Sequence, residues 1–279
     1  MLVIRPKRIL KRARLRLTRR LQPAEPLDPS RTAQPIVVAA LGGSGTRAIT
    51  DLLIESGVFM GGWVDDESRD SLFMRAFLHA HFDRLVDDPE AIDDRTLGEL
   101  HRTLRAHRIG IPHVGAAWGW KNPRSLWLLP LFDRLFPGLR FIHLVRDGRD
   151  MALSRNRFLL DDHGPAILGE RASGSTVRDQ LELWALGNRR AAEVCERGLA
   201  DRCLVLRYED LCAEPLRELE RLLGFLRLDL PRGSVERIAG TVKPSPGLGR
   251  GARDRSETMR AATRRHTDTL ERFGYAIPR

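Results

Sequence analysis

The sequence predicts an α/β protein, a single domain in which helices flank a central parallel sheet. Two short apolar runs, IVVAAL at 36–41 and LRFIHLVR at 139–146, are typical of buried strands. A third run, RCLVLRY at 202–208, has the same character. Helical patterns separate the three runs, and strands that alternate with helices favour a parallel sheet covered on both faces.

Regular apolar spacing and sparse glycine predict the helices that cover this sheet. The expected ranges are 45–56, 69–86, 94–108, 124–138, a helix from about 148, 176–198, 214–226 and 256–272. Residues 22–35 are rich in proline and polar side chains and indicate a linker. We therefore expect a basic N-terminal arm and linker over 1–34, and one domain over 35–279.

The charge of the chain is concentrated at its start. Residues 1–20 hold nine Lys or Arg and no acid. Removing these nine from the 47 basic residues leaves 38, against 37 acidic residues in the rest of the chain. Because a nucleic-acid-binding protein spreads basic charge over a folded face, this near-neutral body argues against that class.

Leu10, Ala13, Leu17 and Leu21 recur at helical spacing among the arginines of the arm. One interpretation is a basic amphipathic helix on an anionic membrane surface. A solvated, partly disordered arm and an organelle transit peptide are the alternatives. No apolar run approaches the length of a transmembrane span.

The three cysteines, Cys195, Cys203 and Cys212, are irregularly spaced. They predict no disulfide framework, and no spacing of His, Cys or carboxylate residues predicts a metal site. We therefore expect a cytoplasmic protein. Peripheral membrane contact through the basic arm stays one of the open interpretations of that segment.

The glycine-rich turn GGSGT at 42–46, between the first strand and the first helix, predicts an anion site. Glycines let backbone N–H groups approach an anion, and the helix N-terminus adds partial positive charge. Ser44 and Thr46 add hydroxyl donors. The nucleotide-kinase pattern GxxxxGK[ST] is not met, because Thr46 and Arg47 follow Gly45.

A second motif, VRDGRDMALS, continues from the strand at 139–146. Arg146 stands at the strand end and Ser154 follows eight residues later, close enough for both to face one phosphate. A guanidinium binds a phosphate through two parallel hydrogen bonds. Pairing of Arg146 with Asp147 or Asp150 at the surface is the alternative.

Together, GGSGTR and VRDGRDMALS resemble the two signatures of the sulfotransferase family that uses 3′-phosphoadenosine 5′-phosphosulfate (PAPS). The segments WKNPRSLWLLPLFDRLFPG and LRYEDLCAEPLRELERLLGFL are similar to further parts of bacterial and tyrosylprotein-type members. The resemblance covers roughly residues 36–250. It implies a P-loop-like nucleotide-binding turn and a transferase that moves a sulfuryl group to a hydroxyl or amine by in-line displacement, without a metal.

The resemblance also implies which residues bind the nucleotide. They are Gly43, Ser44, Gly45, Thr46, Arg47, Arg146, Ser154, Tyr208, Lys243 and Ser245. The 5′-phosphate would lie at the glycine-rich turn and the 3′-phosphate at Arg146 and Ser154. Tyr208 would lie near the adenine, on which an aromatic face stacks. The loop 241–250 resembles a segment that closes over the nucleotide, with Arg250 in reach of the 3′-phosphate.

The family has Lys or Arg where this chain has Gly43, beside the leaving phosphosulfate. Because catalysis needs positive charge there, another residue must supply it. Lys121 matches a lysine that the tyrosylprotein-type members place at the sulfuryl group, and the chain has only four lysines against 43 arginines. Arg47 is the second candidate.

A general base must take the proton of the acceptor. The resemblance implies a carboxylate about twenty residues past the turn, in WVDDESRD, where Asp66 is the first choice. Its rivals there are Asp65, Glu67 and Asp70. His113 and His143 are alternatives because cytosolic-type members use a histidine, although His143 is expected to face the packing of the sheet.

The acceptor is not marked by any motif. Residues 60–118 are expected to build its pocket, for a small molecule, a glycan or a lipid. Two other functions stay open at this point. One is a P-loop-type nucleotide kinase, and the other is a catalytically degenerate nucleotide-binding or membrane-surface protein, in which Gly43 marks the loss of catalysis.

Overall fold

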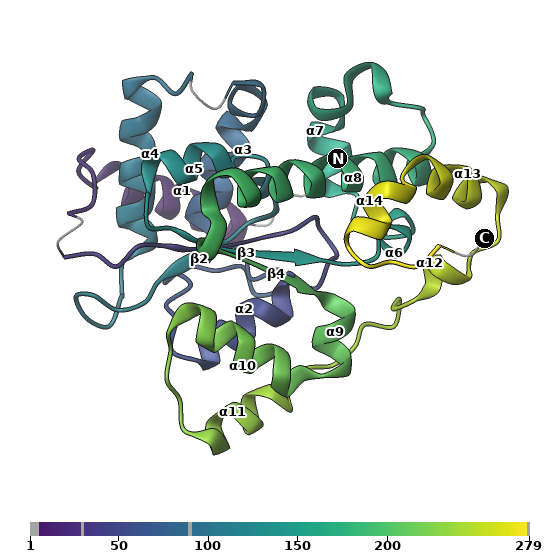
Figure 1. Ribbon diagram of the computed structural model, residues 1–279. Helices are drawn as coiled ribbons and strands as arrows, with labels where there is room; N and C mark the ends of the chain where they lie inside the picture. The colour runs from purple at the N-terminus through teal and green to yellow at the C-terminus, as the bar shows by residue number, and fades with distance from the viewer. Residues whose placement is uncertain (1–5, 29–30, 89–90, 278–279) are drawn as a thin grey trace.

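The centre of the computed structural model, which describes residues 6–28, 31–88 and 91–277, is a parallel four-stranded sheet (Figure 1). Its strands are β1 (Ile36–Ala39), β2 (Gly119–Lys121), β3 (Arg140–Val145) and β4 (Cys203–Arg207), in the order β2-β1-β3-β4. The expected α/β fold with a central parallel sheet is confirmed. Strand β2 was not predicted, because three residues are too few to show a periodicity.

Helices surround this sheet. They are α1 (Pro6–Arg20), α2 (Thr46–Glu55), α3 (Leu72–Asp87), α4 (Asp94–His107), α5 (Leu129–Leu135), α6 (Gly148–Ala152), α7 (Phe158–Leu168), α8 (Thr176–Val194), α9 (Tyr208–Ala213), α10 (Pro215–Leu226), α11 (Arg232–Ala239), α12 (Arg250–Arg253), α13 (Glu257–Arg265) and α14 (Thr267–Arg272). The helix expected over 124–138 divides into a 3₁₀ turn, η1 (Pro123–Leu126), and α5. The helix expected over 256–272 breaks at His266 into α13 and α14.

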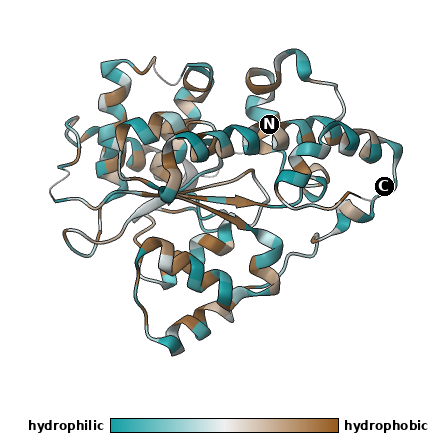
Figure 2. Cartoon of the chain, in the orientation of Figure 1, coloured by the Kyte–Doolittle hydropathy of each residue, from teal (hydrophilic) through white to brown (hydrophobic). Residues whose placement is uncertain are grey.

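Both faces of the sheet are buried, because successive side chains of a strand point to opposite faces. Val37 and Ala39 of β1 belong to the core beneath α3, α4 and α8. Ile36 and Val38 belong to the second core, which α2, α10 and α11 cover from the other side. Figure 2 shows apolar residues along the strands at the centre, and a mixture of polar and apolar residues on the helices around them.

All four strands run parallel, so their carboxyl ends share one edge of the sheet. Ile36 pairs with Gly119 on one side and Arg140 on the other. The residues that follow or end these strands at this edge are the glycine-rich turn after β1, Lys121 in β2, Arg146 after β3 and Tyr208 after β4. The topology therefore gathers four sequence motifs at the place where parallel sheets bind ligands.

The N-terminal segment lies against the rest of the protein. Helix α1 packs on α4 and α3. Two carbonyls of the linker accept hydrogen bonds from the rest of the protein. Arg105 of α4 donates to the carbonyl of Pro26 at 2.7 Å, and the indole N–H of Trp118 donates to the carbonyl of Ala33 at 2.6 Å. The division of the chain into an arm over 1–34 and a domain over 35–279 stays a prediction.

One expectation about the cysteines was wrong. Cys195, after the last residue of α8, and Cys203, at the start of β4, form a disulfide with their Cα atoms 5.7 Å apart. The sequence spacing gave no sign of it, because the chain reverses direction between α8 and β4 and so brings the two residues together. Cys212 is a free cysteine. None of the described helices has both the length and the hydropathy to cross a membrane.

Candidate active site at the carboxyl edge of the sheet

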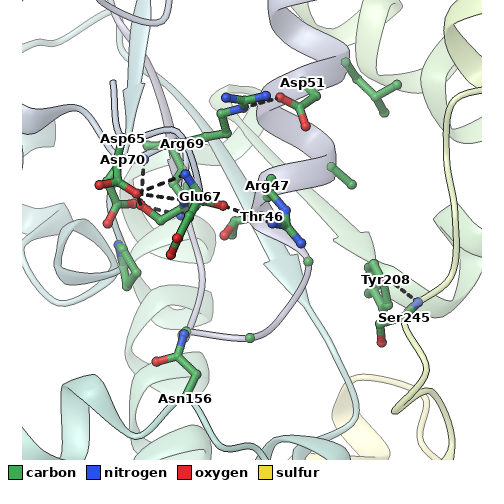
Figure 3. A pocket seen from close by; sticks show the side chains of 18 of the residues that line it. Thr46, Arg47, Asp51, Asp65, Glu67, Arg69, Asp70, Asn156, Tyr208 and Ser245 are labelled. Atoms are coloured by element: carbon green, nitrogen blue, oxygen red, sulfur yellow. Dashed lines mark hydrogen bonds and ion pairs between the residues drawn. The ribbon is translucent and has the colours of Figure 1, made fainter. Parts of the chain in front are cut away.

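A cavity of 1610 Å³ opens at the carboxyl edge of the sheet. Its walls come from the glycine-rich turn and α2, from the loop before α3, from the ends of β2 and β3, and from the segment 241–246. In Figure 3 the turn runs through the middle, with Glu67 and Asp70 on one side and Tyr208 and Ser245 on the other. A cavity of this size has room for a nucleotide together with a second molecule.

The turn owes its shape to two glycines in the left-handed region, Gly43 with φ 98° and Gly45 with φ 90°. A Cβ on Gly45 would lie 2.2 Å from Cδ2 of Tyr208, so no larger residue fits there. Gly45 caps α2, and no side chain among the described residues caps that N-terminus. The first N–H groups of α2 are therefore available to an anion at the cavity.

Gly43 cannot be exchanged for Lys or Arg without strain. Its φ of 98° disfavours any L side chain, and a Cβ would lie 3.0 Å from Oγ of Ser154 and 3.3 Å from Cε of Met151. The local backbone conformation therefore suits Gly43 and not the Lys or Arg that the family pattern has at this position. The positive charge of the site has to come from other elements.

The two sequence motifs meet at Arg146, which is only 7% exposed. Its guanidinium donates to the carbonyl of Gly43 at 3.1 Å and to the carboxylate of Asp150 at 2.9 Å, and lies 5.0 Å from the ring of Tyr208. Its Nε has no partner among the described residues. The pairing with Asp150 considered from the sequence does form, but it is buried and lies at the cavity.

The two serines of the motifs do not line the cavity. The Ser44 side chain is buried and its hydroxyl donates to Sδ of Met151 at 3.6 Å. The Ser154 hydroxyl accepts from the N–H of Asn156 at 3.1 Å. Neither serine lines the cavity, whereas Thr46 and Asn156 do. Sequence reasoning missed Asn156, and its position two residues past Ser154 was the only signal for it.

Tyr208 links the glycine-rich turn to the loop 241–250, which is called the C-terminal loop below. Its buried ring packs on Gly45, and its hydroxyl accepts from the N–H of Ser245 at 2.9 Å. Burial raises the pKa of Tyr208, so the phenol stays protonated. Lys243 and Ser245 line the cavity, and Oγ of Ser245 has no partner among the described residues.

Asp150 is a residue whose importance only the structure reveals. It is 1% exposed, and its carboxylate accepts from the N–H groups of Gly249 at 2.8 Å and Gly251 at 2.7 Å, besides Arg146. The guanidinium of Arg250 also donates to the Asp150 carbonyl at 3.3 Å. Asp150 thereby fastens the C-terminal loop to the second motif.

Both candidates for the missing positive charge line the cavity. Lys121, 5% exposed, donates from Nζ to the carboxylate of Asp70 at 2.8 Å and to the carbonyl of Ser68 at 2.7 Å. An ammonium has three N–H donors, so one remains for a bound molecule. Arg47 donates to the carbonyl of Glu67 at 3.1 Å (Figure 3).

The four acidic candidates of WVDDESRD differ in position. Asp66 is exposed and does not line the cavity, whereas Asp65, Glu67 and Asp70 do. The carboxylate of Asp70 forms an ion pair with Lys121. Burial alone would raise the pKa of Asp65, but hydrogen bonds from Ser68 and the charge of Arg75 lower it overall.

Glu67 is the remaining carboxylate of this group. Its side chain is exposed at the cavity, and no side chain of the described residues donates to its carboxylate. The two histidine candidates lie elsewhere. His113 is exposed outside the cavity wall, and the buried His143 pairs with Asn188 at 2.8 Å behind the sheet.

A match to known proteins identifies the class of this site. The sequence profile of the sulfotransferase family matches residues 62–232, more than half of the chain. The chain belongs to the sulfotransferase family. The family expected from the two motifs is thereby confirmed, together with the reaction class, the transfer of a sulfuryl group from PAPS to an acceptor.

Solved structures similar to this sulfotransferase show the same fold. The sulfotransferase STF9 from Mycobacterium avium has a TM-score of 0.56 at 12% identity, over 97% of this chain and 81% of that chain. The sulfotransferase domain of the Synechococcus PCC 7002 olefin synthase has a TM-score of 0.54 at 16% identity, over 91% and 100%. The sulfotransferase domain from the curacin biosynthetic pathway has a TM-score of 0.52 at 14% identity, over 89% and 100%.

Proposed function

We propose that this sulfotransferase binds PAPS along the cavity at the carboxyl edge and transfers its sulfuryl group to a hydroxyl or amine of a small-molecule, glycan or lipid acceptor. One observation carries the proposal. The glycine-rich turn, Arg146 and Tyr208 come from three different strands and meet around a single cavity. Their convergence fits a ligand with two phosphate groups and an aromatic base.

The polar groups of the cavity support a nucleotide in a specific orientation. The uncapped N-terminus of α2 and Thr46 would hold the 5′-phosphate. Arg146, which lines the cavity, and the segment with Lys243 and Ser245 would hold the 3′-phosphate. Tyr208, between these two groups, would contact the adenine. Ser44 and Ser154 would support the turn and the second motif.

The transfer needs a cation at the sulfuryl group and a base at the acceptor. We assign the first role to Lys121, whose third N–H is directed by the fixed partners Asp70 and Ser68. Arg47 would assist it and also orients Glu67 through the carbonyl of that residue. Because Glu67 lines the cavity with an unoccupied carboxylate, we assign the base to Glu67 in place of Asp66.

In this mechanism Glu67 accepts the proton of the acceptor hydroxyl while the acceptor oxygen forms a bond to sulfur. The bond from sulfur to the 5′-phosphate oxygen breaks in line, and adenosine 3′,5′-bisphosphate leaves with the electron pair. Lys121 stabilises the negative charge on the oxygens around sulfur and on the leaving group.

The acceptor would enter over the less polar part of the wall. Leu15, Leu72, Pro123 and Phe158 line the same cavity as Lys121 and Glu67. These side chains suit a partly apolar acceptor that presents one nucleophilic group. We further propose that the protein contacts membranes peripherally through its N-terminal helix. The cytoplasmic location expected from the cysteines loses its ground, because Cys195 and Cys203 form a disulfide, which a reducing compartment disfavours.

Nucleotide selectivity tests the proposal. Adenosine 3′,5′-bisphosphate should raise the melting temperature, because a ligand that binds only the folded state stabilises it. ATP with magnesium should raise it much less, since it lacks the 3′-phosphate. Transfer of labelled sulfate from PAPS to a panel of phenols, sugars and glycolipids would then identify the acceptor. A stronger shift with ATP and magnesium would contradict the assignment of the cavity.

A further inference from the structure

The N-terminal helix α1 carries a charge that the active site does not use. Its fifteen residues, PKRILKRARLRLTRR, hold eight Lys or Arg and no acid. We propose that the outer face of α1 is a docking surface for an anionic membrane, and that the inner side of the same helix faces the cavity. This proposal specifies the peripheral membrane contact proposed above and does not depend on sulfuryl transfer.

The outer face of α1, over its described side chains, presents exposed apolar residues beside exposed arginines. Leu17 is 59% exposed and Leu21, one helical turn further along the chain, is 72% exposed. Arg16 and Arg20, their neighbours, are exposed as well. Leucines flanked by arginines are the composition of a helix that lies in the membrane interface, with its apolar side chains below the headgroups and its cations among them.

The helix is fixed to the catalytic body, so a membrane bound to it would have a defined orientation. Helix α1 packs on α4 and α3, and the segment after it is held along α4. Ala24 accepts from His101 at 2.8 Å, and Arg105 donates to the carbonyl of Pro26 at 2.7 Å. A helix that was joined to the catalytic body by a flexible linker alone would leave the orientation of that body to the membrane undefined.

The same helix reaches the active site. Leu15, two residues before the exposed Leu17, lines the cavity. The guanidinium of Arg14 lies 5.0 Å from the ring of Trp63, in the loop that also carries Glu67. Because residues two apart in a helix point to opposite sides, a membrane on the outer face of α1 is separated from the cavity by this one helix.

A nucleic acid is the other polyanion that a basic helix attracts. It would use the cations of α1 but leave Leu17 and Leu21 in water, whereas a membrane buries both. The near-neutral charge of the remaining chain, 38 basic against 37 acidic residues, gives a nucleic acid no extended basic face. The observations therefore favour a lipid surface.

Cosedimentation of the full chain with vesicles tests this proposal. The vesicles are phosphatidylcholine alone, or phosphatidylcholine with an equal part of phosphatidylglycerol, at low and at high salt. We expect binding only to the anionic vesicles, and weaker binding at high salt because counter-ions screen the arginines. The double variant Leu17→Gln/Leu21→Gln should reduce the partition coefficient about tenfold or more.

The matched control is Val114→Gln, which removes an apolar side chain that is 65% exposed on the loop between α4 and β2. It should bind vesicles like the parent, and the melting temperature with adenosine 3′,5′-bisphosphate should be the same in all three proteins. Three results would overturn the proposal: a parent that ignores anionic vesicles, a double variant that binds like the parent, or an equal loss in Val114→Gln. Tighter binding to single-stranded RNA than to the vesicles would overturn it too.

Discussion

At the scale of single residues, Gly43 decides where the site carries its positive charge. The left-handed φ of 98° and the contacts to Ser154 and Met151 keep a long side chain out of this position. Lys121 reaches the same cavity from β2 and is fixed there by Asp70 and Ser68. In the proposed mechanism, the cation of the site therefore stands on β2 and not in the turn.

Replacing Lys121 by alanine should lower kcat about 10²- to 10³-fold, because the charge on sulfur and on the leaving oxygen loses its stabilisation. The affinity for adenosine 3′,5′-bisphosphate should change little. Lys243→Ala is the matched control, since Lys243 is exposed at the nucleotide end of the cavity and should weaken affinity more than turnover. Isothermal titration and initial rates separate the two effects. Equal losses of rate and affinity in Lys121→Ala would make Lys121 a binding residue and Arg47 the catalytic cation.

The choice of base can be tested by two isosteric changes one position apart. Glu67→Gln should lower kcat about 10²- to 10⁴-fold, because the amide cannot accept the acceptor proton. Asp66→Asn should stay within about twofold of the parent, because Asp66 is exposed and lies outside the cavity wall. Rates at saturating PAPS compare the two variants. The opposite ranking would return the base to Asp66.

At the scale of elements, the junction between β1 and α2 builds the anion site. Gly45 ends the turn, caps α2 and makes room for Tyr208, which begins α9. The packing of one glycine against one tyrosine therefore connects the ends of β1 and β4. The turn suits a phosphate because its glycines let backbone N–H groups approach an anion at the N-terminus of α2.

Alanine substitutions at two glycines of similar backbone conformation distinguish the cost of backbone strain from the cost of a packing clash. Gly45→Ala should destabilise the protein by about 2–4 kcal/mol and weaken nucleotide binding, because the new methyl group would overlap Tyr208. Gly57, just after α2, has φ 86° with no atom within 4 Å of a built Cβ. Gly57→Ala should cost only about 1 kcal/mol of backbone strain and leave nucleotide binding intact. Urea midpoints give the comparison, and equal losses in both variants would argue against a role for the Tyr208 contact.

At the scale of the whole molecule, buried histidines connect the sheet to the helices around it. His107 of α4 pairs through Nδ1 with the hydroxyl of Ser71 and through Nε2 with the carbonyl of Gly119, both at 2.8 Å. His143 of β3 pairs with Asn188 of α8. Burial lowers the pKa of His107 and of His143 to about 4, so both are neutral in the folded protein.

This arrangement predicts a loss of stability in acid. In the unfolded chain both histidines bind a proton below about pH 6.5, whereas the folded protein resists protonation down to about pH 4. Within this window the unfolded state binds more protons, so the free energy of unfolding falls as the pH falls, by about 3 kcal/mol per histidine over the whole window.

Urea unfolding between pH 7 and pH 5 measures this slope. His107→Gln should reduce the slope, since one titrating group is removed. The control His113→Gln should not change it, because His113 is exposed. A midpoint that does not move with pH in the parent protein would contradict the prediction.

Patterns along the chain were enough to predict most of this fold. The apolar runs at 36–41, 139–146 and 202–208 are the strands β1, β3 and β4 within one or two residues. A strand that is buried on both faces needs consecutive apolar residues, so the apolar run by itself identifies the strand. The short β2 and the helices α9 and α11 carry too few residues for a period to emerge.

The candidate site could likewise be predicted in part. The sequence by itself determined the family, the anion-binding turn and the strand-end arginine, because these depend on residue type and spacing at fixed positions of an α/β fold. Only the tertiary structure decided that Ser44 and Ser154 do not line the cavity, that Glu67 lines it whereas Asp66 does not, and that Asp150 holds the C-terminal loop. The direction of a loop side chain depends on neighbours that are distant in sequence, and no local pattern encodes them.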